Sequence, residues 1–152
     1  MSHKIVLPLS LAILLFLGSF SPNPINNSFA SNFDSIPGFM IGNFTDDYGV
    51  QYSITDSVWT QLPRARYHIL EWNAKDKYLI ARNDSANASE PGLYSRIDVM
   101  EFSGMAPFQW GFCLSVYDAP TQALAKSKYQ ADRVNPRKGC NGFPFSRMRP
   151  KE

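Results

Sequence analysis

Residues 108–117 alternate with a period of two, and this pattern constrains the fold more than any other feature of the sequence. The even positions carry large apolar side chains: Phe108, Trp110, Phe112, Leu114 and Val116. Most odd positions carry smaller or polar side chains, and Cys113 is one of them. Because successive side chains of a strand point to opposite faces, the stretch predicts a β-strand. One face of this strand needs an apolar core, and the other can be covered closely by another segment.

The N-terminal residues have the pattern of a secretory signal peptide. Residues 5–20 form a largely apolar run, which is shorter than the roughly 20 residues that a membrane-spanning helix needs. Ser28 and Ala30 are small residues at the positions that signal peptidase reads. We predict a signal peptide over residues 1–30, cleaved after Ala30, followed by a linker over residues 31–37. The alternative is an uncleaved N-terminal anchor.

Cys113 and Cys140 are the only cysteines of the chain. An exported protein meets an oxidising compartment, where such a pair forms a disulfide, and closing this loop should stabilise the fold by roughly 3 kcal/mol. The chain has too few soft ligands for a metal centre, because His68 is the only histidine after residue 30. We therefore expect a Cys113–Cys140 disulfide that ties the C-terminal tail to the strand, with no metal and no cofactor.

The remainder of the chain is rich in period-two segments and poor in helix signals. Strands are predicted at residues 39–44, 50–55 with an interrupted continuation at 58–61, 66–72, 77–83, 92–102 and 108–117. Sequential strands with short connections predict an antiparallel meander, which curls up to hide its edges. The expected fold is all-β, with about six or more strands in a small barrel or half-barrel over residues 38–118.

A single helix is expected after the meander, over residues 120–131. Asp118 can serve as its N-cap, and Pro120 fits its first turn. Its apolar face is thin, so the helix should lie outside the barrel against small residues such as Gly111. Residues 119–152, which include the helix and the tail, are expected to pack on the barrel as part of the same domain.

Four segments resemble a family of small secreted bacterial proteins: residues 78–84, 94–98, 117–121 and 139–143. This resemblance implies export and carries no activity with it. The meander with an outer helix is also similar in architecture to the calycins, which include lipocalins and fatty-acid-binding proteins. The lipocalin Gly-x-Trp signature is absent here, because Gly42-Asn43-Phe44 has phenylalanine where tryptophan is expected.

Charge is distributed unevenly along the chain. Acidic residues outnumber basic ones from residue 31 to 118, and basic residues outnumber acidic ones afterwards. The basic residues of the tail include Arg133, Arg137, Lys138, Arg147, Arg149 and Lys151. They could meet an anionic envelope surface. Alternatively the tail lies against the acidic barrel of its own chain, which the tether at Cys140 favours. Nucleic acid is not an expected partner of an exported protein.

The most promising binding residues lie on the predicted strand 92–102, where Tyr94, Arg96 and Asp98 share one face. If that face looks into the barrel, Arg96 would anchor the acidic head group of a ligand and Asp98 would hold it in place. If Ile97 and its neighbours look inward instead, the pair is a surface salt bridge of little weight. The sequence leaves both placements open.

His68 and Trp72 share a face of the predicted strand 66–72 and complete the candidate ligand-binding set. A lone histidine in a strand is more often a residue of the barrel mouth than a catalyst. The sequence contains no phosphate-binding loop and no metal-spaced cluster. We therefore expect no enzymatic activity.

After residue 30, three asparagines satisfy the glycosylation sequon: Asn43, Asn83 and Asn87. The last two lie at or within the predicted polar loop over residues 84–91, where exposure is expected.

Two functions of different class follow from these features. The first is a secreted barrel that binds a small apolar or amphiphilic ligand. The second is an envelope-associated structural or interaction module whose barrel is filled by its own aromatic side chains. For both we expect a monomer that is periplasmic or extracellular after signal-peptide cleavage.

Overall fold

The computed structural model describes residues 35–151. These residues belong to one compact unit, Asn32–Glu152. The predicted signal peptide and its cleavage site after Ala30 lie outside the described residues, as does the predicted linker as far as residue 34. Ile36, near the end of that linker, is buried in the core. The packed part of the chain therefore begins before residue 38.

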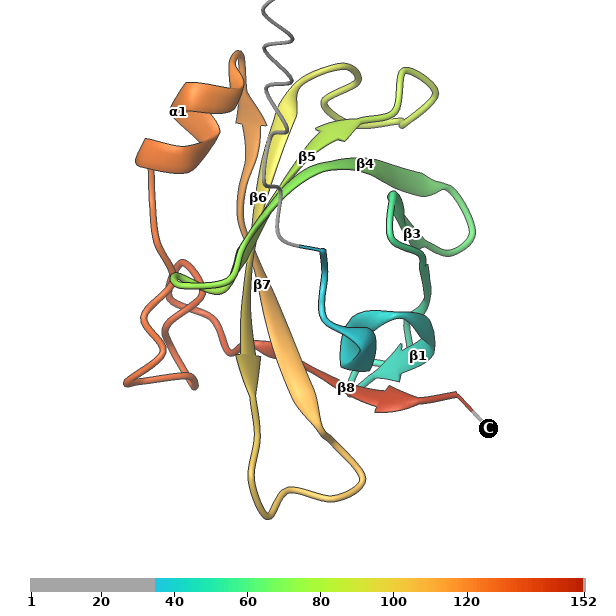
Figure 1. Cartoon of the computed structure of the whole chain (residues 1–152), viewed down its shortest axis with the longest axis vertical. Helices are drawn as coiled ribbons and strands as arrows, with labels where there is room; N and C mark the ends of the chain where they lie inside the picture. Colours follow the sequence, from blue (N-terminus) through green and yellow to red (C-terminus); the bar gives the residue numbers. More distant parts are fainter. Residues whose placement is uncertain (1–34, 152) are drawn as a thin grey trace, which may run out of the picture. The chain divides into compact units, whose positions relative to one another are not determined.

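Eight antiparallel strands follow one another around a closed barrel, and the last strand returns to pair with the first (Figure 1). The strands are β1 (Gly42–Asp46), β2 (Gln51–Ile54), β3 (Val58–Gln61), β4 (Ala65–Asn73), β5 (Tyr78–Asn83), β6 (Tyr94–Glu101), β7 (Trp110–Ala119) and β8 (Ser146–Pro150). The prediction of an all-β antiparallel barrel with one helix and a disulfide-stapled tail is confirmed. Closure through β8 pairs strand edges that an open meander would expose.

Two details at the start of the barrel differ from the predicted strands. Gly38–Met40 form a short 3-10 helix, η1, so the first strand begins at Gly42. The interrupted second strand is two separate strands, because the chain turns at Thr55. The hydroxyl of Thr55 accepts a hydrogen bond from the Val58 amide at 3.0 Å, which fixes that turn.

β8 is absent from the predicted strands. Its alternation is short, with Arg147 and Arg149 on either side of Met148, and only Met148 is fully buried in the core. This pattern is hard to separate from a basic tail. The strand is fixed by its pairing with β1 and β7 on its two sides.

A tight turn over residues 46–49 joins β1 and β2. Asp46 Oδ1 accepts hydrogen bonds from the Tyr48 amide at 2.9 Å and the Val50 amide at 2.8 Å, and Gly49 has a φ of 85°. Asp46 Oδ2 accepts a further hydrogen bond from the Tyr52 hydroxyl at 3.0 Å. Burial, and after it the charge of Asp46, raises the pKa of Tyr52, so this hydroxyl remains a donor.

The barrel interior is filled by the protein's own side chains. Trp59 and Trp110 meet edge to face, with ring centroids 5.9 Å apart, and Phe112 lies 5.0 Å from the Trp59 ring. Phe44 packs edge to face on Trp110, with ring centroids 5.2 Å apart. Aromatic pairs at such distances and angles are favourable. The middle of the barrel is therefore an aromatic core.

One helix, α1 (Gln122–Ser127), lies outside the barrel against β5, β6 and β7 (Figure 1). It is shorter than predicted. Its N-cap is Thr121 rather than Asp118, and the Thr121 hydroxyl accepts a hydrogen bond from the Leu124 amide at 3.2 Å. Asp118 pairs instead with Lys128 Nζ at 2.7 Å.

Gly111 faces the outside of the barrel, but it is covered by Phe102 and the Ser146 backbone rather than by the helix. A Cβ atom at residue 111 would lie 2.7 Å from Phe102 Cζ and 2.9 Å from the Ser146 carbonyl oxygen. We expect Gly111→Ala to lower the free energy of unfolding by about 1–3 kcal/mol through overpacking, measured by urea denaturation. Gly38→Ala is the control, because no atom lies within 4 Å of a Cβ there. Equal stability of the two variants would contradict this packing.

Candidate functional site

Arg96 and Asp98 lie on the outer face of β6, because Ile97 and Val99, which alternate with them, belong to the barrel core. The Arg96 and Asp98 side chains are nevertheless only 1% and 0% exposed. Two hydrogen bonds of 3.0 Å join them, from Arg96 Nε to Asp98 Oδ2 and from Arg96 Nη2 to Asp98 Oδ1. The pair thus has neither predicted placement: it does not face the interior and is not a surface salt bridge. The helix and tail cover it.

Asp98 is the centre of a network that joins the tail to the barrel. Its carboxylate also accepts hydrogen bonds from Ser115 Oγ at 2.5 Å and from the Ala131 amide at 3.4 Å. Arg133 Nη2 donates to Asp98 Oδ1 at 3.0 Å, and Arg133 Nε donates to the Val99 carbonyl at 2.9 Å. Two arginines and two neutral donors therefore converge on one buried carboxylate, which compensates its desolvation.

Arg96 extends this network to the helix. Its Nη1 donates to the Lys126 carbonyl in the last turn of α1 at 2.7 Å, and its guanidinium lies 3.8 Å from the centre of the Tyr78 ring. Tyr94, the third candidate of this face, packs against a buried cluster that includes Ala125 of the helix. The structure brings Tyr94, Arg96 and Asp98 together, but under the helix and tail, where they stabilise packing and leave no room for a ligand.

His68 and Trp72 lie apart from that group and from each other. The pairing of β4 with β5 shifts between Ile69 and Glu71, and this bulge turns Trp72 into the barrel core. His68 stays outside, with its Nε2 2.8 Å from Asp84 Oδ2. The Ala86 amide and then His68 lower the pKa of Asp84 through hydrogen bonds. Among the described residues His68 has no nucleophilic side chain as a hydrogen-bond partner.

Asn83 and Asn87 are buried, contrary to the expected exposure. Asn83 Nδ2 donates to the Glu90 and Tyr117 carbonyls, both at 2.9 Å. Asn87 exchanges side-chain hydrogen bonds with the backbone of Arg66 at 2.9 and 2.8 Å. Their amides hold the loop after β5 against the barrel.

The Cys113–Cys140 disulfide is confirmed, with Cα atoms 5.4 Å apart. It lies on the outer, small-residue face of β7, where Cys113 packs with Ala131 and Phe145. Tyr129 adds to this attachment, since its hydroxyl donates to the Gly139 carbonyl at 3.0 Å. The tail therefore crosses β7 and is fixed there by a covalent bond and by side-chain contacts.

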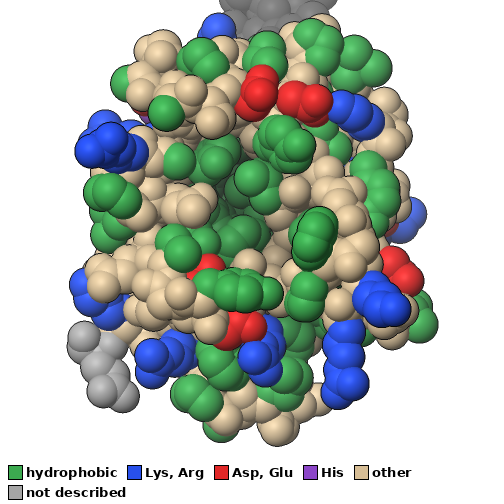
Figure 2. All heavy atoms as spheres, turned by 180° about the vertical axis from the view of Figure 1, so that it is seen from behind, with side chains coloured by type: hydrophobic (Ala, Val, Ile, Leu, Met, Phe, Trp, Pro, Cys, Tyr) green, Lys and Arg blue, Asp and Glu red, His purple; other side chains and the backbone are tan. Residues whose placement is uncertain are grey.

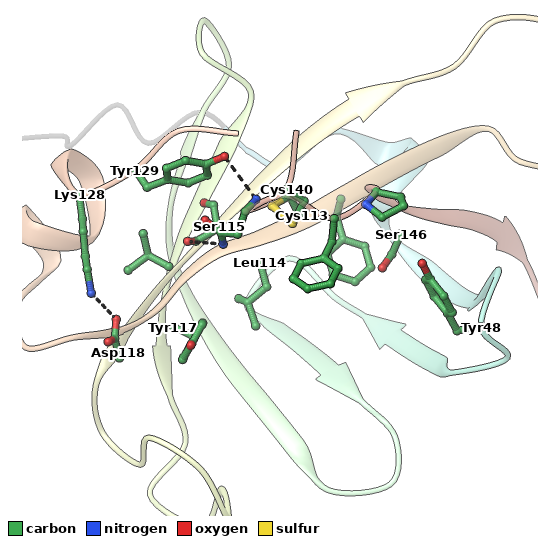
Figure 3. A pocket seen from close by; sticks show the side chains of 15 residues that line it. Tyr48, Cys113, Leu114, Ser115, Tyr117, Asp118, Lys128, Tyr129, Cys140 and Ser146 are labelled. Carbon is green, nitrogen blue, oxygen red and sulfur yellow. Dashed lines mark hydrogen bonds and ion pairs between the residues drawn. A yellow bond between two sulfur atoms is a disulfide. The ribbon is translucent and has the colours of Figure 1, made fainter. Parts of the chain in front are cut away.

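A groove of about 810 Å³ runs along β7 beside this disulfide (Figure 3). Leu114 and Tyr117 lie on one side of the strand, whereas Tyr129 and Cys140 lie on the other. The Asp118–Lys128 ion pair stands at one end and Tyr48 at the opposite end. Of the predicted ligand-binding and disulfide residues, only Cys113 and Cys140 line this groove.

The rim of the groove is rich in exposed apolar surface. Tyr48, Tyr117 and Phe143 line it and are 66%, 50% and 72% exposed. One face of the molecule is hollowed between hydrophobic side chains (Figure 2). Gathered aromatic side chains of this kind mark binding surfaces. The sequence signal for them is weak, because these residues come from a turn, a strand and the tail.

The basic tail contacts its own barrel through two arginines. Arg133 binds Asp98 as described, and Arg147 Nε lies 2.7 Å from Asp47 Oδ2. Arg149 is exposed, and Lys151 Nζ donates to Gln51 Oε1 at 3.0 Å. An anionic envelope surface as partner of the exposed residues stays a prediction.

Within residues 35–151 no helix is long and apolar enough to span a membrane. The same residues hold no group of three or more histidine, cysteine, aspartate or glutamate side chains placed to bind a metal ion. Comparisons with protein families, with curated proteins and with solved structures found no match.

Proposed function

We propose that this protein is an exported, non-catalytic binding protein that holds an apolar or amphiphilic ligand in the groove along β7. The observation that carries this proposal is the exposed aromatic rim of Tyr48, Tyr117 and Phe143 around a groove of about 810 Å³. Binding sites commonly have volumes of about 300–1,000 Å³ and apolar walls. Exposed aromatic side chains gain most when a ligand covers them.

The polar end of the groove suits an amphiphile. The Asp118 and Lys128 side chains are 42% and 53% exposed and form an ion pair there, and the hydrogen bond from Lys128 lowers the pKa of Asp118. An anionic head group could share Lys128 with Asp118. The disulfide that builds one wall of the groove supports an oxidising compartment, and hence export.

A second candidate is a ligand inside the barrel. One observation favours it: the indole N–H of Trp110 is buried and has no acceptor among the described residues, and such a donor is costly to leave unpaired. Against it stand Trp59 and Trp110 themselves, which are 1% and 0% exposed and occupy the middle of the barrel. A ligand there would have to displace an aromatic core.

The groove is tested with the dye anilinonaphthalene sulfonate, an apolar molecule with one negative charge. We expect the double variant Tyr117→Ser, Phe143→Ser to bind the dye about tenfold or more weakly, because burying a large apolar side chain contributes roughly 1.5–3 kcal/mol. Leu124→Ser is the control, since Leu124 is 48% exposed on α1 and does not line the groove. Fluorescence titration gives the affinities, and equal loss in variant and control would contradict the proposed site.

A further inference from the structure

The C-terminal half of β7 has an open edge. Its pairing with β6 continues to Ala119, whereas its pairing with β8 ends at Phe112, opposite Ser146. Among the described residues no strand lies beside β7 on that side after Phe112. The groove along β7 follows this open edge, because its walls include Leu114 and Asp118.

Pro144 explains why β8 stops where it does. In the register of β8 on β7, Phe112 lies opposite Ser146, so the position opposite Leu114 would fall to Pro144. Proline has no amide N–H and cannot complete a ladder at that position. The chain instead leaves the sheet, and Phe145 packs on the outer face. Leu114 is left with no strand partner there.

The backbone of Leu114 points toward this edge. Val99 donates its N–H to the Lys77 carbonyl on the β5 side, so its partner Phe112 faces away from β6. Backbone groups alternate along a strand, and Leu114 therefore also faces away from β6, with its N–H and C=O directed into the groove.

Ser115 lies outside the regular alternation, because the pairing of β6 with β7 shifts between Arg96 and Ile97, which lie opposite Val116 and Leu114. The carbonyl of this extra residue already has a partner from the tail. Asn141 Nδ2 donates to the Ser115 carbonyl at 3.1 Å, from a residue with a φ of 52°. A side-chain amide thus supplies one of the hydrogen bonds that a neighbouring strand would supply. Such a bond can be exchanged for a backbone bond at little net cost.

We propose that the groove binds an extended polypeptide segment, which pairs with Leu114 and continues the line of β8 along β7. This inference rests on the proposed function and names its ligand. Strand addition at an open edge is a common mode of peptide recognition, in which backbone hydrogen bonds give affinity and alternate side chains give specificity. Here alternate side chains would meet Leu114 and Tyr117 on one side of the strand and Tyr129 on the other (Figure 3).

The continuity with the existing β7–β8 interface favours a single segment over other occupants. A small amphiphile can cover Tyr117 but presents no donor and acceptor at strand spacing to Leu114. A second copy pairing through its own β7 would bring its own Asn141 and Phe143, which line the groove, against those of the first copy. A separate peptide segment has no folded domain attached beside it, so it avoids this clash.

The test selects linear random decapeptides displayed on phage against the full oxidised protein, with counter-selection on the variant Tyr117→Ser, Phe143→Ser. A selected peptide is then synthesised with N-methyl groups on either the odd or the even residues. In strand addition only one of the two sets faces β7, so we expect one methylated peptide to bind at least about tenfold more weakly and the other within about twofold of the parent. Fluorescence anisotropy measures both.

Asn141→Gly gives an independent readout, because glycine accepts the positive φ and lacks the competing amide. We expect the parent peptide to bind this variant about three- to tenfold more tightly. Equal effects of the two methylation patterns, or no peptide enriched over counter-selection, would overturn the inference while dye binding could still support the groove. The inference would also be overturned if sedimentation showed a dimer of the protein that the peptide does not dissociate. Failure of both dye and peptide would remove the proposed function as well.

Discussion

Replacing Asp98 by asparagine is expected to lower the free energy of unfolding by about 3–5 kcal/mol, because the change leaves two arginines without their buried counter-charge. Arg96 is 1% exposed and Arg133 is 29% exposed, and both bind Asp98 at 3.0 Å. The carboxylate accepts hydrogen bonds from Ser115 and Ala131, whereas the NH2 group of an asparagine amide is a donor and could not accept them. Urea denaturation measures the loss.

Glu101→Gln is the matched control on the same strand. Glu101 pairs with Lys77 at 3.0 Å, but the two side chains are 54% and 49% exposed, so the change should alter stability by no more than about 1 kcal/mol. Unfolding of the Asp98 and Glu101 variants at the same urea concentration would contradict a large contribution of the Asp98 network to the free energy of unfolding.

Removing the disulfide by Cys113→Ala with Cys140→Ala is expected to lower the free energy of unfolding by roughly 3–4 kcal/mol, since the bond closes a loop between residues 27 positions apart. The tail should loosen between Asp132 and Phe145, because β8 and Arg133 still hold its ends. Hydrogen exchange of the amides in this segment measures the loosening.

The parent protein in the presence of a dithiol reductant is the control for the cysteine variant. The two proteins differ in the side chains at residues 113 and 140, but both lack the disulfide. Their urea midpoints should therefore agree and lie below that of the oxidised parent. If the oxidised parent were no more stable than the variant, the disulfide would not stabilise the attachment of the tail to β7.

The sequence predicts the barrel well because its strands alternate in hydrophobicity and its turns carry suitable residues. The alternation of residues 108–117 places Phe112 inside and Cys113 outside, as observed. Asp46 and Gly49, which are residue types typical of turns, form the turn between β1 and β2. These features depend on local periodicity and backbone conformation. A single sequence expresses them directly.

The placement of Arg96 depends on a contact between distant parts of the chain and escapes such reasoning. Alternation offers an inner and an outer face, and an outer charge is normally solvated. Here residues from α1 and the tail cover the outer face, so the pair is outside the barrel and still buried. Arg133 lies 35 positions from Asp98 in sequence, and no local pattern links them.

The candidate site eluded prediction for a similar reason. Tyr48 comes from a turn, Tyr117 from β7 and Phe143 from the tail, and each alone is an unremarkable exposed residue. Trp72 is placed on the wrong face by strict alternation, because alternation does not reveal a β-bulge. The register shift between Ile69 and Glu71 moves Trp72 to the face opposite His68.

Two-dimensional proton–nitrogen NMR during titration with anilinonaphthalene sulfonate distinguishes a ligand bound along β7 from one bound inside the barrel. The amides of Leu114, Tyr117 and Phe143 should shift on binding, because these residues line the groove. The indole N–H signals of Trp59 and Trp110, which are 1% and 0% exposed in the barrel core, should stay in place. Shifts of both indole signals without any at Tyr117 would contradict the account and place the ligand inside the barrel.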